Sequence, residues 1–279
     1  MYKITDIQLK NQNARFLHRK NPNKPVMVFI PGNLQEIETI ENLNVSFGAN
    51  FNYYAIELPG TGHTNPLHPS YNIRFLADCL SEFVTQYIKG PFHLVSCSYA
   101  TALALEYAKA NSHKISKLVL AGSMQEIPLS EWPTVLGLMA DCMRDTRQFA
   151  SDFMQLLTAP DVDIPRQKLI IRATKRKSSD YTEKQFWCFI FNSIRLMTYA
   201  ANNLHLIRCP TLCFTGEHDP YVTPSRCLSL AKQIPHAKFE ALPNADHLFH
   251  LEQPEQTVRL ITSYLNEPDL CSKLTPQLG

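Results

Sequence analysis

Long hydrophobic runs, CxxC cysteine pairs and an excess of charge of one sign are all missing from this chain of 279 residues. Its 27 Lys and Arg oppose 25 Asp and Glu, and the resulting formal charge of +2 is far from the basic excess that neutralises a run of phosphates. The longest apolar runs, such as residues 25–31, fall well short of the roughly 20 residues that span a bilayer. We therefore expect neither a nucleic-acid partner nor a transmembrane segment.

The N-terminus and the cysteines favour a reducing compartment. Residues 1–7 carry a lysine and an aspartate and contain no apolar stretch followed by small residues, so a secretory signal is not expected. The eight cysteines show no CxxC spacing, and several lie in apolar segments, where a reduced thiol behaves as a small hydrophobic side chain. The sequence predicts a cytoplasmic protein without disulfides, metal or cofactor.

Short apolar runs alternate with longer amphipathic segments along most of the chain. This alternation is typical of parallel strands joined by crossover helices, and it predicts an α/β fold with a mostly parallel central sheet flanked by helices. Strands are expected at residues 3–9, 14–18, 26–30, 52–58, 93–96, 117–121, 211–215 and 238–241. Helices are expected between them at residues 73–88, 101–111, 224–233 and 254–265.

The strand pattern disappears between residues 128 and 203. We expect a helical cap at 128–203, inserted into a core of residues 1–127 and 204–266, with a loose tail at 267–279. Helix-like stretches in the cap are residues 135–144, 146–157 and 183–203. Its larger apolar side chains either pack the cap on the sheet or line an acyl pocket; they are Trp132, Tyr181, Phe186, Trp187, Phe189, Phe191 and Met197.

The most informative segment, residues 92–108, runs from an apolar strand into a helix with no room for a loop. The residue at such a bend has a strained backbone, and only small residues fit two positions away on either side. Ser98 meets this condition because Ser96 and Ala100 flank it, whereas Cys97 would have larger residues there. We predict that Ser98 is a nucleophile whose hydroxyl lies near a helix N-terminus, where negative charge is favoured.

These motifs and their order resemble the α/β-hydrolase fold superfamily over about residues 14–265. The resemblance rests on Pro31-Gly32-Asn33 after one strand, on residues 57–62 (Glu-Leu-Pro-Gly-Thr-Gly) after the next, and on Ser96-Cys-Ser98-Tyr-Ala100 at the bend. The superfamily usually has glycine at both positions that flank the nucleophile, so Ser96 and Ala100 depart from its pattern.

A serine hydroxyl is a weak nucleophile and needs an imidazole within hydrogen-bond reach. His247 follows the last predicted strand and precedes the last predicted helix, which is where this fold carries its histidine. His250 is the alternative, but it lies within an apolar run and is expected to cap the final helix.

An acidic group must fix the tautomer of the histidine. Asp219 stands in a Gly-Glu-His-Asp-Pro turn after an apolar strand and resembles the acid of the family, whereas Glu217 comes two residues too early. Asp246, beside His247, is expected to point elsewhere. The chain order Ser98, Asp219, His247 is the order that this fold requires, so the resemblance implies a Ser-His-Asp triad.

Acyl transfer creates an oxyanion that two backbone N–H groups should bind. One donor is expected from Tyr99, the residue after the nucleophile. By resemblance the second comes from Asn33, in the loop where the superfamily usually has His-Gly and this chain has Pro31-Gly32-Asn33. We expect the missing histidine to cost the loop one stabilising hydrogen bond.

The sequence thus predicts a serine hydrolase that acts on a small-molecule carboxylic ester or thioester through an acyl-enzyme. Two alternatives stay open: an acyltransferase similar to the bacterial enzymes that use 3-hydroxyacyl groups on acyl carrier protein or coenzyme A, and a binding protein that keeps the fold without catalysis. Dehalogenases and epoxide hydrolases of this fold need a carboxylate where Ser98 stands.

A cationic cluster in the predicted cap bears on the choice between these alternatives. It is either a solvated helix face and loop or a docking patch for acyl carrier protein or for the phosphates of coenzyme A. Its members are Arg166, Lys168, Arg172, Lys175, Arg176 and Lys177.

Overall fold

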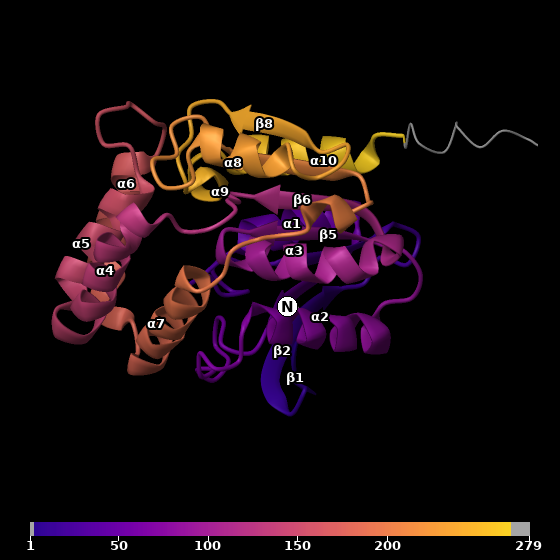
Figure 1. The fold of residues 1–279 in the computed structure, drawn as a ribbon, viewed down its shortest axis with the longest axis horizontal. Coiled ribbons are helices and arrows are strands. Elements are labelled where there is room, and N and C mark those ends of the chain that lie inside the picture. Colours follow the sequence, from indigo (N-terminus) through magenta and orange to yellow (C-terminus); the bar gives the residue numbers. More distant parts are fainter. Residues whose placement is uncertain (1–2, 269–279) are drawn as a thin grey trace, which may run out of the picture.

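The computed structural model describes residues 3–268, and an eight-stranded sheet with strand order β1-β2-β4-β3-β5-β6-β7-β8 runs through it (Figure 1). β1 pairs antiparallel with β2, and β2 with β4, while all other neighbours are parallel. The strands are β1 (Ile4–Leu9), β2 (Gln12–Arg19), β3 (Val26–Ile30), β4 (Asn52–Glu57), β5 (Phe92–Cys97), β6 (Ile115–Ala121), β7 (Thr211–Gly216) and β8 (Lys238–Leu242). The predicted fold class and all eight predicted strands are confirmed.

Helices cover both faces of the sheet and form a separate group near one end of it (Figure 1). They are α1 (Glu41–Asn50), α2 (Ile73–Tyr87), α3 (Tyr99–Asn111), α4 (Trp132–Arg144), α5 (Thr146–Leu157), α6 (Gln167–Lys177), α7 (Glu183–Met197), α8 (Pro224–Ala231), α9 (Phe249–Glu252) and α10 (Pro254–Asn266). Within residues 3–268 no helix is both long and apolar enough to cross a bilayer.

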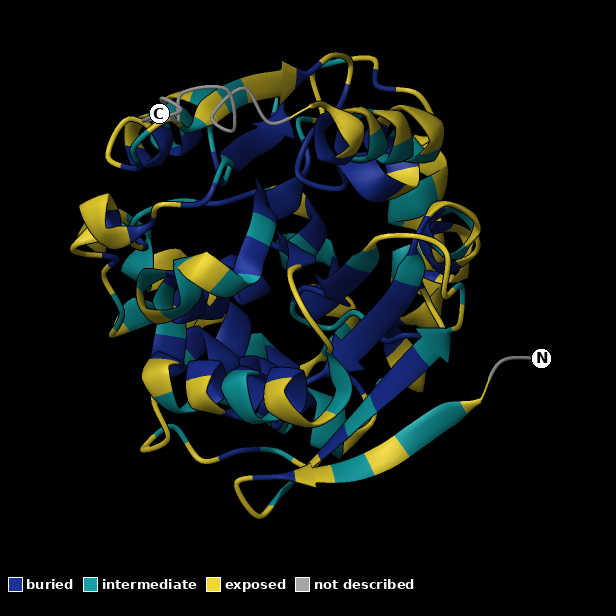
Figure 2. Ribbon diagram, turned by 90° about the vertical axis from the view of Figure 1, so that its right-hand side faces the viewer, coloured by how far each residue is buried: buried dark blue, intermediate teal, exposed yellow. Residues whose placement is uncertain are grey.

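The two faces of the sheet bury separate apolar cores, because side chains alternate along a strand. Leu94 of β5 and Leu120 of β6 pack into the core beneath α2, α3 and α8, whereas Val95 of β5 packs into the core beneath α1 and α10. Figure 2 shows the inner strands buried and β1 more exposed at the rim of the sheet. Strands covered on both faces explain the continuous apolar runs in the sequence.

The position of β3 decides where a ligand can bind. β3 lies between β4 and β5, and Ile30 at its end pairs with Ser96 of β5. The chain therefore leaves β3 in one direction along the sheet and later crosses back over it, which opens a crevice at the carboxyl ends of these strands. The loop after β3 and the turn after β5 meet at this crevice.

Residues 128–203, which we call the helical segment, carry α4 to α7 and separate β6 from β7. Figure 1 shows this segment at the left, at the end of the sheet to which the arrowheads of β6 and β8 point. A capping box fixes the start of α7, since Thr182 accepts from the Gln185 N–H and the Gln185 side chain accepts from the Thr182 N–H. Beneath it lies a third apolar cluster that includes Phe149 and Phe186.

The structure differs from the predictions in its helices. α1, α6 and α9 were not predicted: α1 has buried Asn44 among its core residues, exposed cations dominate the composition of α6, and α9 spans only four residues. α7 ends at Met197, before the predicted end at residue 203, because the chain then pairs Ala200 with Glu126.

The predicted tail and one of the cysteines lie partly or wholly outside the described residues. Lys117 Nζ donates to the carbonyl oxygen of Glu267 at 2.5 Å, so the first residue of the predicted tail is anchored on β6. Residues 269–279, including Cys271, lie outside the described part of the chain. The seven described cysteines are buried and form no disulfide with one another. The cytoplasmic location stays a prediction.

Candidate active site

Ser98 occupies a strained bend between β5 and α3. Its backbone has φ 48° and ψ −120°, a conformation that few residues with a side chain adopt. Ser96 and Ala100 are fully buried on either side, and the Ser98 N–H donates to the Ala121 carbonyl oxygen at 2.8 Å. The predicted bend with small flanking residues is therefore present, and it holds the hydroxyl above the carboxyl ends of β5 and β6.

Ser98, His247 and Asp219 form a continuous hydrogen-bonded chain. Ser98 Oγ lies 2.9 Å from His247 Nε2, and His247 Nδ1 lies 2.7 Å from Asp219 Oδ2. Because the Asp219 carboxylate can only accept, Nδ1 carries the ring proton and Nε2 is free to accept from the Ser98 hydroxyl. The structure thus brings the three predicted side chains together, although they are far apart in the sequence.

The turn after β7 holds Asp219 in place. Its Oδ1 accepts from the N–H groups of Tyr221 and Val222 at 3.0 and 2.8 Å, and its Oδ2 accepts from the Thr215 hydroxyl at 2.6 Å. The side chain is 0% exposed, so these bonds replace the water that an ionised carboxylate needs. Glu217 lies on the exposed side of the same turn, in agreement with the choice of Asp219 from the sequence.

Two effects act on His247 in opposite directions. Burial of the ring lowers its pKa, but the charge of Asp219, the hydrogen bond to Asp219 and the charge of Asp246 together raise the pKa above its ordinary value. Space for the ring comes from Gly122, which has φ +65° and where a Cβ would lie 3.1 Å from His247 Cε1. A buried imidazole beside a carboxylate suits a general base near neutral pH.

The loop that carries His247 is anchored on the helical segment. The His247 N–H donates to the Leu157 carbonyl oxygen at 3.2 Å. Asp246 takes no part in the hydrogen-bonded chain of Ser98, His247 and Asp219, as expected. Its Oδ2 accepts from the Ala159 N–H at 3.3 Å and from Gln167 Nε2 at 3.0 Å. The position of the histidine therefore depends on the connection between α5 and α6.

A second carboxyl group lies buried behind this loop. Glu252 is 2% exposed, and its Oε2 accepts from the Asp246 N–H at 2.9 Å. Burial and the charge of nearby Asp246 raise the pKa of Glu252 to about 9. The protonated, neutral form of Glu252 is therefore favoured at neutral pH.

The loop after β3 reaches the Ser98 bend, because a Cβ on Gly32 would lie 3.3 Å from Ser98 Cβ. The Gly32 N–H donates to Gln35 Oε1 at 2.6 Å, and Gln35 Nε2 lies 2.8 Å from His250 Nε2. The expectation that His250 caps the final helix is wrong, since its ring supports this loop. Burial, and to a lesser degree the charge of His247, lower the pKa of His250 to about 4 and keep the ring neutral.

The side chain of Asn33 is also held in place. Asn192 Nδ2, from α7, donates to Asn33 Oδ1 at 3.0 Å. The loop therefore has two supports, at Gly32 and at Asn33, which come from side chains other than the histidine that the superfamily usually has there. Asn33 and Tyr99 both border the cavity that contains Ser98, as residues that supply oxyanion donors must.

A cavity of about 750 Å³ opens above Ser98. Its walls are largely apolar and come from the helical segment, with Leu138, Phe153, Leu156 and Phe189 among them, while Ser98 and His247 lie at its base. Of the aromatic residues left open in the sequence, Tyr181 and Phe189 line this cavity, whereas Phe186 packs in the cluster of the helical segment. A cavity of this size and character suits a small molecule with an apolar part.

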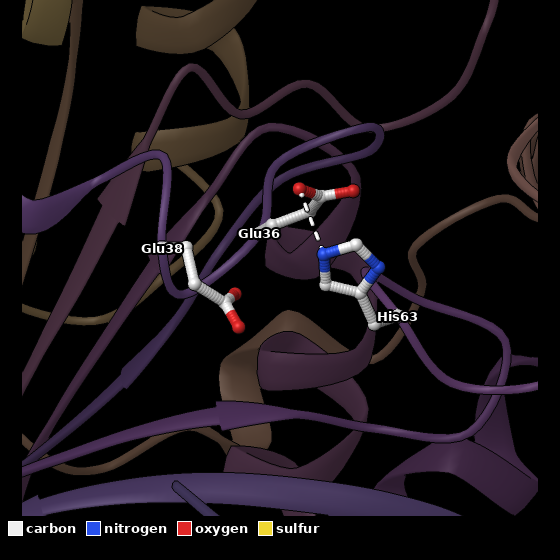
Figure 3. Close-up of side chains that lie close together, drawn as sticks. All are labelled: Glu36, Glu38 and His63. Carbon is white, nitrogen blue, oxygen red and sulfur yellow. Dashed lines mark ion pairs between the residues drawn. The ribbon is translucent and has the colours of Figure 1, made fainter. Parts of the chain in front are cut away.

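Glu36, Glu38 and His63 lie close together near the cavity, with ligand-type atoms within 4.8 Å of one another (Figure 3). Glu36 accepts from Gln185 Nε2 at 2.6 Å and faces His63 Nε2 at 3.1 Å. Both Nη atoms of Arg15 hold the Glu38 carboxylate at 2.8 and 2.6 Å. Because protein groups already engage both carboxylates, we assign no metal to this cluster.

The predicted cationic cluster lies on and just before α6, and its members are exposed. Lys168 makes a 3.7 Å contact with exposed Asp163, a pair that contributes little in water. Leu169 and Lys177 also border the cavity, so the cationic helix forms part of its rim.

Known proteins resemble this chain in sequence and in fold. A model of the alpha/beta hydrolase family matches residues 27–260. The chain belongs to this family. It is 24% identical to a poly(3-hydroxyalkanoate) depolymerase of Ectopseudomonas oleovorans over 95% of this chain and 93% of that protein. It is also 24% identical to a monoacylglycerol lipase of Xenopus laevis (abhd6-B), over 88% of this chain and 77% of the lipase.

Solved structures support the fold assignment. An alpha/beta hydrolase enzyme from a Medee basin deep-sea metagenome library superposes with a TM-score of 0.86 at 15% identity, over 95% of this chain and 98% of that one. A thermophilic esterase from Thermogutta terrifontis superposes with a TM-score of 0.77 at 16% identity, over 94% and 98% of the two chains. At such low identity these likenesses show the fold alone.

Proposed function

We propose that this protein hydrolyses a carboxylic ester through an acyl-enzyme on Ser98. The observation that carries the proposal is the Ser98–His247–Asp219 hydrogen-bonded chain, with distances of 2.9 and 2.7 Å, at the base of an apolar cavity. A serine, an oriented imidazole and a buried acid in this arrangement are the requirements for nucleophilic attack on a carbonyl carbon.

Each residue has a defined part in the proposed reaction. Ser98 Oγ bonds to the ester carbon while its proton passes to His247 Nε2, and the carbonyl electron pair moves to the oxygen. The Tyr99 and Asn33 N–H groups bind this oxyanion. When it collapses, the bond to the alcohol oxygen breaks and His247 protonates that oxygen. Water then attacks the acyl carbon and gives a proton to His247. His247 passes this proton to Ser98 Oγ as the bond between Oγ and the acyl carbon breaks, which releases the acid and restores the serine.

The neighbouring thiol does not compete for this role. Cys97 lies next to Ser98 but is buried, and burial raises the pKa of its thiol to about 12. At neutral pH it is therefore a thiol and not the reactive thiolate. The similarity to a depolymerase of a polyester and to a monoacylglycerol lipase supports an ester as the substrate.

A second candidate is transfer of an acyl group from a carrier-bound thioester to a hydroxyl acceptor. The observation that favours it is the cationic α6 at the rim of the cavity, which could attract an acidic acyl carrier protein or the phosphates of coenzyme A. The first half-reaction is the same, and only the group that resolves the acyl-enzyme differs.

The test is to label the purified protein with a fluorophosphonate and to measure hydrolysis of p-nitrophenyl acetate, butyrate and octanoate. We expect labelling and turnover in the native chain and neither in Ser98→Ala. Gln155→Ala, at an exposed position of α5, serves as the control and should behave as the native chain.

The outcomes separate the candidates. Labelling with slow turnover that a hydroxyl acceptor accelerates would favour the transferase, and a native protein that is neither labelled nor active would favour a non-catalytic binding protein. Labelling that persists in Ser98→Ala would place the nucleophile elsewhere and overturn the proposal.

A further inference from the structure

Two polar side chains on α7 are buried although the helix packs in an apolar cluster. Asn192 is 0% exposed and Arg195, one turn later, is 2% exposed. A buried guanidinium is costly unless its donors find partners, and no carboxylate among the described residues forms an ion pair with Arg195. The burial of both Asn192 and Arg195 therefore calls for an explanation other than apolar packing.

Arg195 donates hydrogen bonds to the oxygen atoms around it. Its Nε donates to the Tyr71 carbonyl at 2.6 Å, and its Nη2 donates to the carbonyl oxygens of His68, at 3.0 Å, and Leu67. Its Nη1 donates to Asn192 Oδ1 at 2.6 Å. The arginine therefore ties α7 to the loop after β4 and fixes which way the Asn192 amide faces.

With its oxygen held by Arg195, Asn192 must turn its nitrogen to the other side. Asn192 Nδ2 donates to the Gly60 carbonyl at 2.9 Å and to Asn33 Oδ1 at 3.0 Å. A flipped amide would place its NH₂ group against the guanidinium and its oxygen against two acceptors. The direction of this hydrogen bond to Asn33 is thus dictated by Arg195.

The other proposed oxyanion donor lies beside the same arginine. The Tyr99 side chain is buried, and burial raises the pKa of its hydroxyl to about 12, a rise that the Arg195 charge partly offsets. The Asn33 side chain is thus hydrogen-bonded to Asn192, whereas the buried Tyr99 hydroxyl is near enough to feel the Arg195 charge but has no hydrogen-bond partner among the described residues. Neither Asn192 nor Arg195 borders the cavity.

We infer that Asn192 and Arg195 are positioning residues that set the oxyanion hole from α7. The inference rests on the proposed function. Donors that are fixed before the reaction need not reorganise as the oxyanion forms, so their support lowers the barrier of the chemical step more than it changes substrate binding. In this chain the Asn192 bond supports the loop where the superfamily usually has a histidine.

The test is a double-mutant cycle of Asn33→Ala and Asn192→Ala, with p-nitrophenyl butyrate as substrate. Asn33→Ala keeps the backbone N–H and removes only the link to Asn192. We expect each single variant to lower kcat by about tenfold with little change in KM, and the double variant to lose no more than either single one. The rate of fluorophosphonate labelling should fall in parallel.

Two controls keep the result interpretable. Asn202→Ala removes an exposed amide next to the end of the helical segment and should leave kcat unchanged. Thermal unfolding shows whether Asn192→Ala still folds. If it does not, Asn33→Ala still tests the hydrogen bond between Asn33 and Asn192, because Asn33 is only half-buried.

Each outcome decides the inference. The inference is overturned, while the proposed function stands, by any of three results. These are a kcat loss in the double variant equal to the product of the two single losses, an unchanged kcat in Asn33→Ala, and a change that affects KM alone. If the native protein neither hydrolyses the ester nor takes the label, the proposed function fails and this inference falls with it.

Discussion

Gln35 Nε2 lies 2.8 Å from His250 Nε2, and because an amide nitrogen can only donate, this imidazole nitrogen must be the unprotonated one. The low pKa of His250, about 4, agrees with a ring that stays neutral. The other end of the Gln35 side chain accepts from the Gly32 N–H. A histidine outside the Ser98–His247–Asp219 hydrogen-bonded chain thus supports the loop that carries Asn33.

The first prediction concerns this support. His250→Phe keeps a ring in place but removes the acceptor, so it should lower kcat for p-nitrophenyl butyrate by about fivefold, as expected for one lost hydrogen bond of about 1 kcal/mol. His250→Gln, which offers an amide oxygen to Gln35, should recover part of the loss. Equal activity in both variants would speak against the role of this bond, with exposed His205→Gln as the control.

The second prediction concerns pH. The base must be neutral to accept the Ser98 proton, and the pKa of His247 is raised, so kcat/KM should fall as the pH is lowered through a midpoint above 6.5. Asp219→Asn removes the charge that raises this pKa; the midpoint should move to lower pH while the rate drops by roughly a thousandfold or more. A midpoint that does not move in Asp219→Asn would contradict the assignment.

The third prediction concerns stability and follows from Glu252. The pKa of Glu252 is about 9 in the folded chain and has an ordinary value of 4.5, so between these values the folded state holds a proton that the unfolded state has lost. Stability should therefore fall as the pH rises from about 5 to 9. Glu252→Gln removes this dependence, and its urea midpoint should exceed that of the native chain increasingly over this range.

The control for Glu252 is Glu255→Gln, at an exposed position of α10. It should leave the slope of stability against pH unchanged. A Glu252→Gln variant that is destabilised equally at pH 5 and pH 9 would show that packing, and not the retained proton, governs this site.

The fourth prediction concerns the cavity. Leu156 is half-buried on its wall, and Leu156→Trp adds bulk where an acyl chain would lie. The ratio of kcat/KM for the octanoate ester to that for the acetate ester should fall by about tenfold. Gln155→Trp adds the same group at the exposed neighbouring position and should preserve the ratio. A similar loss for both esters in Leu156→Trp would point to a general disturbance instead.

Local patterns in the sequence predicted the sheet and the bend at Ser98, and the resemblance to the α/β-hydrolase superfamily supplied Asp219 and His247. Apolar runs predict buried strands, and small residues around Ser98 predict the bend. The three side chains come at strand ends, and parallel strands bring those ends to one edge of the sheet. Their catalytic roles stay proposals until the variants are measured.

The supports of the oxyanion loop could not be predicted in this way. Asn192 and Arg195 stand one turn apart on α7, a spacing that in sequence resembles an ordinary solvated helix face. His250 lies in an apolar run, from which the sequence predicts a helix cap and not a contact with Gln35. Their partners, Gly60, Asn33 and Gln35, lie more than a hundred residues earlier, so only the folded chain reveals these contacts.

The separation of β6 from β7 has a consequence for synthesis of the protein. β6 pairs with β7 through residues 118–121, yet its partner begins only at Thr211, after the whole helical segment. Until the ribosome has passed that point, an apolar strand stands at an open sheet edge, a known hazard for aggregation. Prematurely ended chains that stop within the helical segment should consequently be poorly recovered from cells and should depend on chaperones.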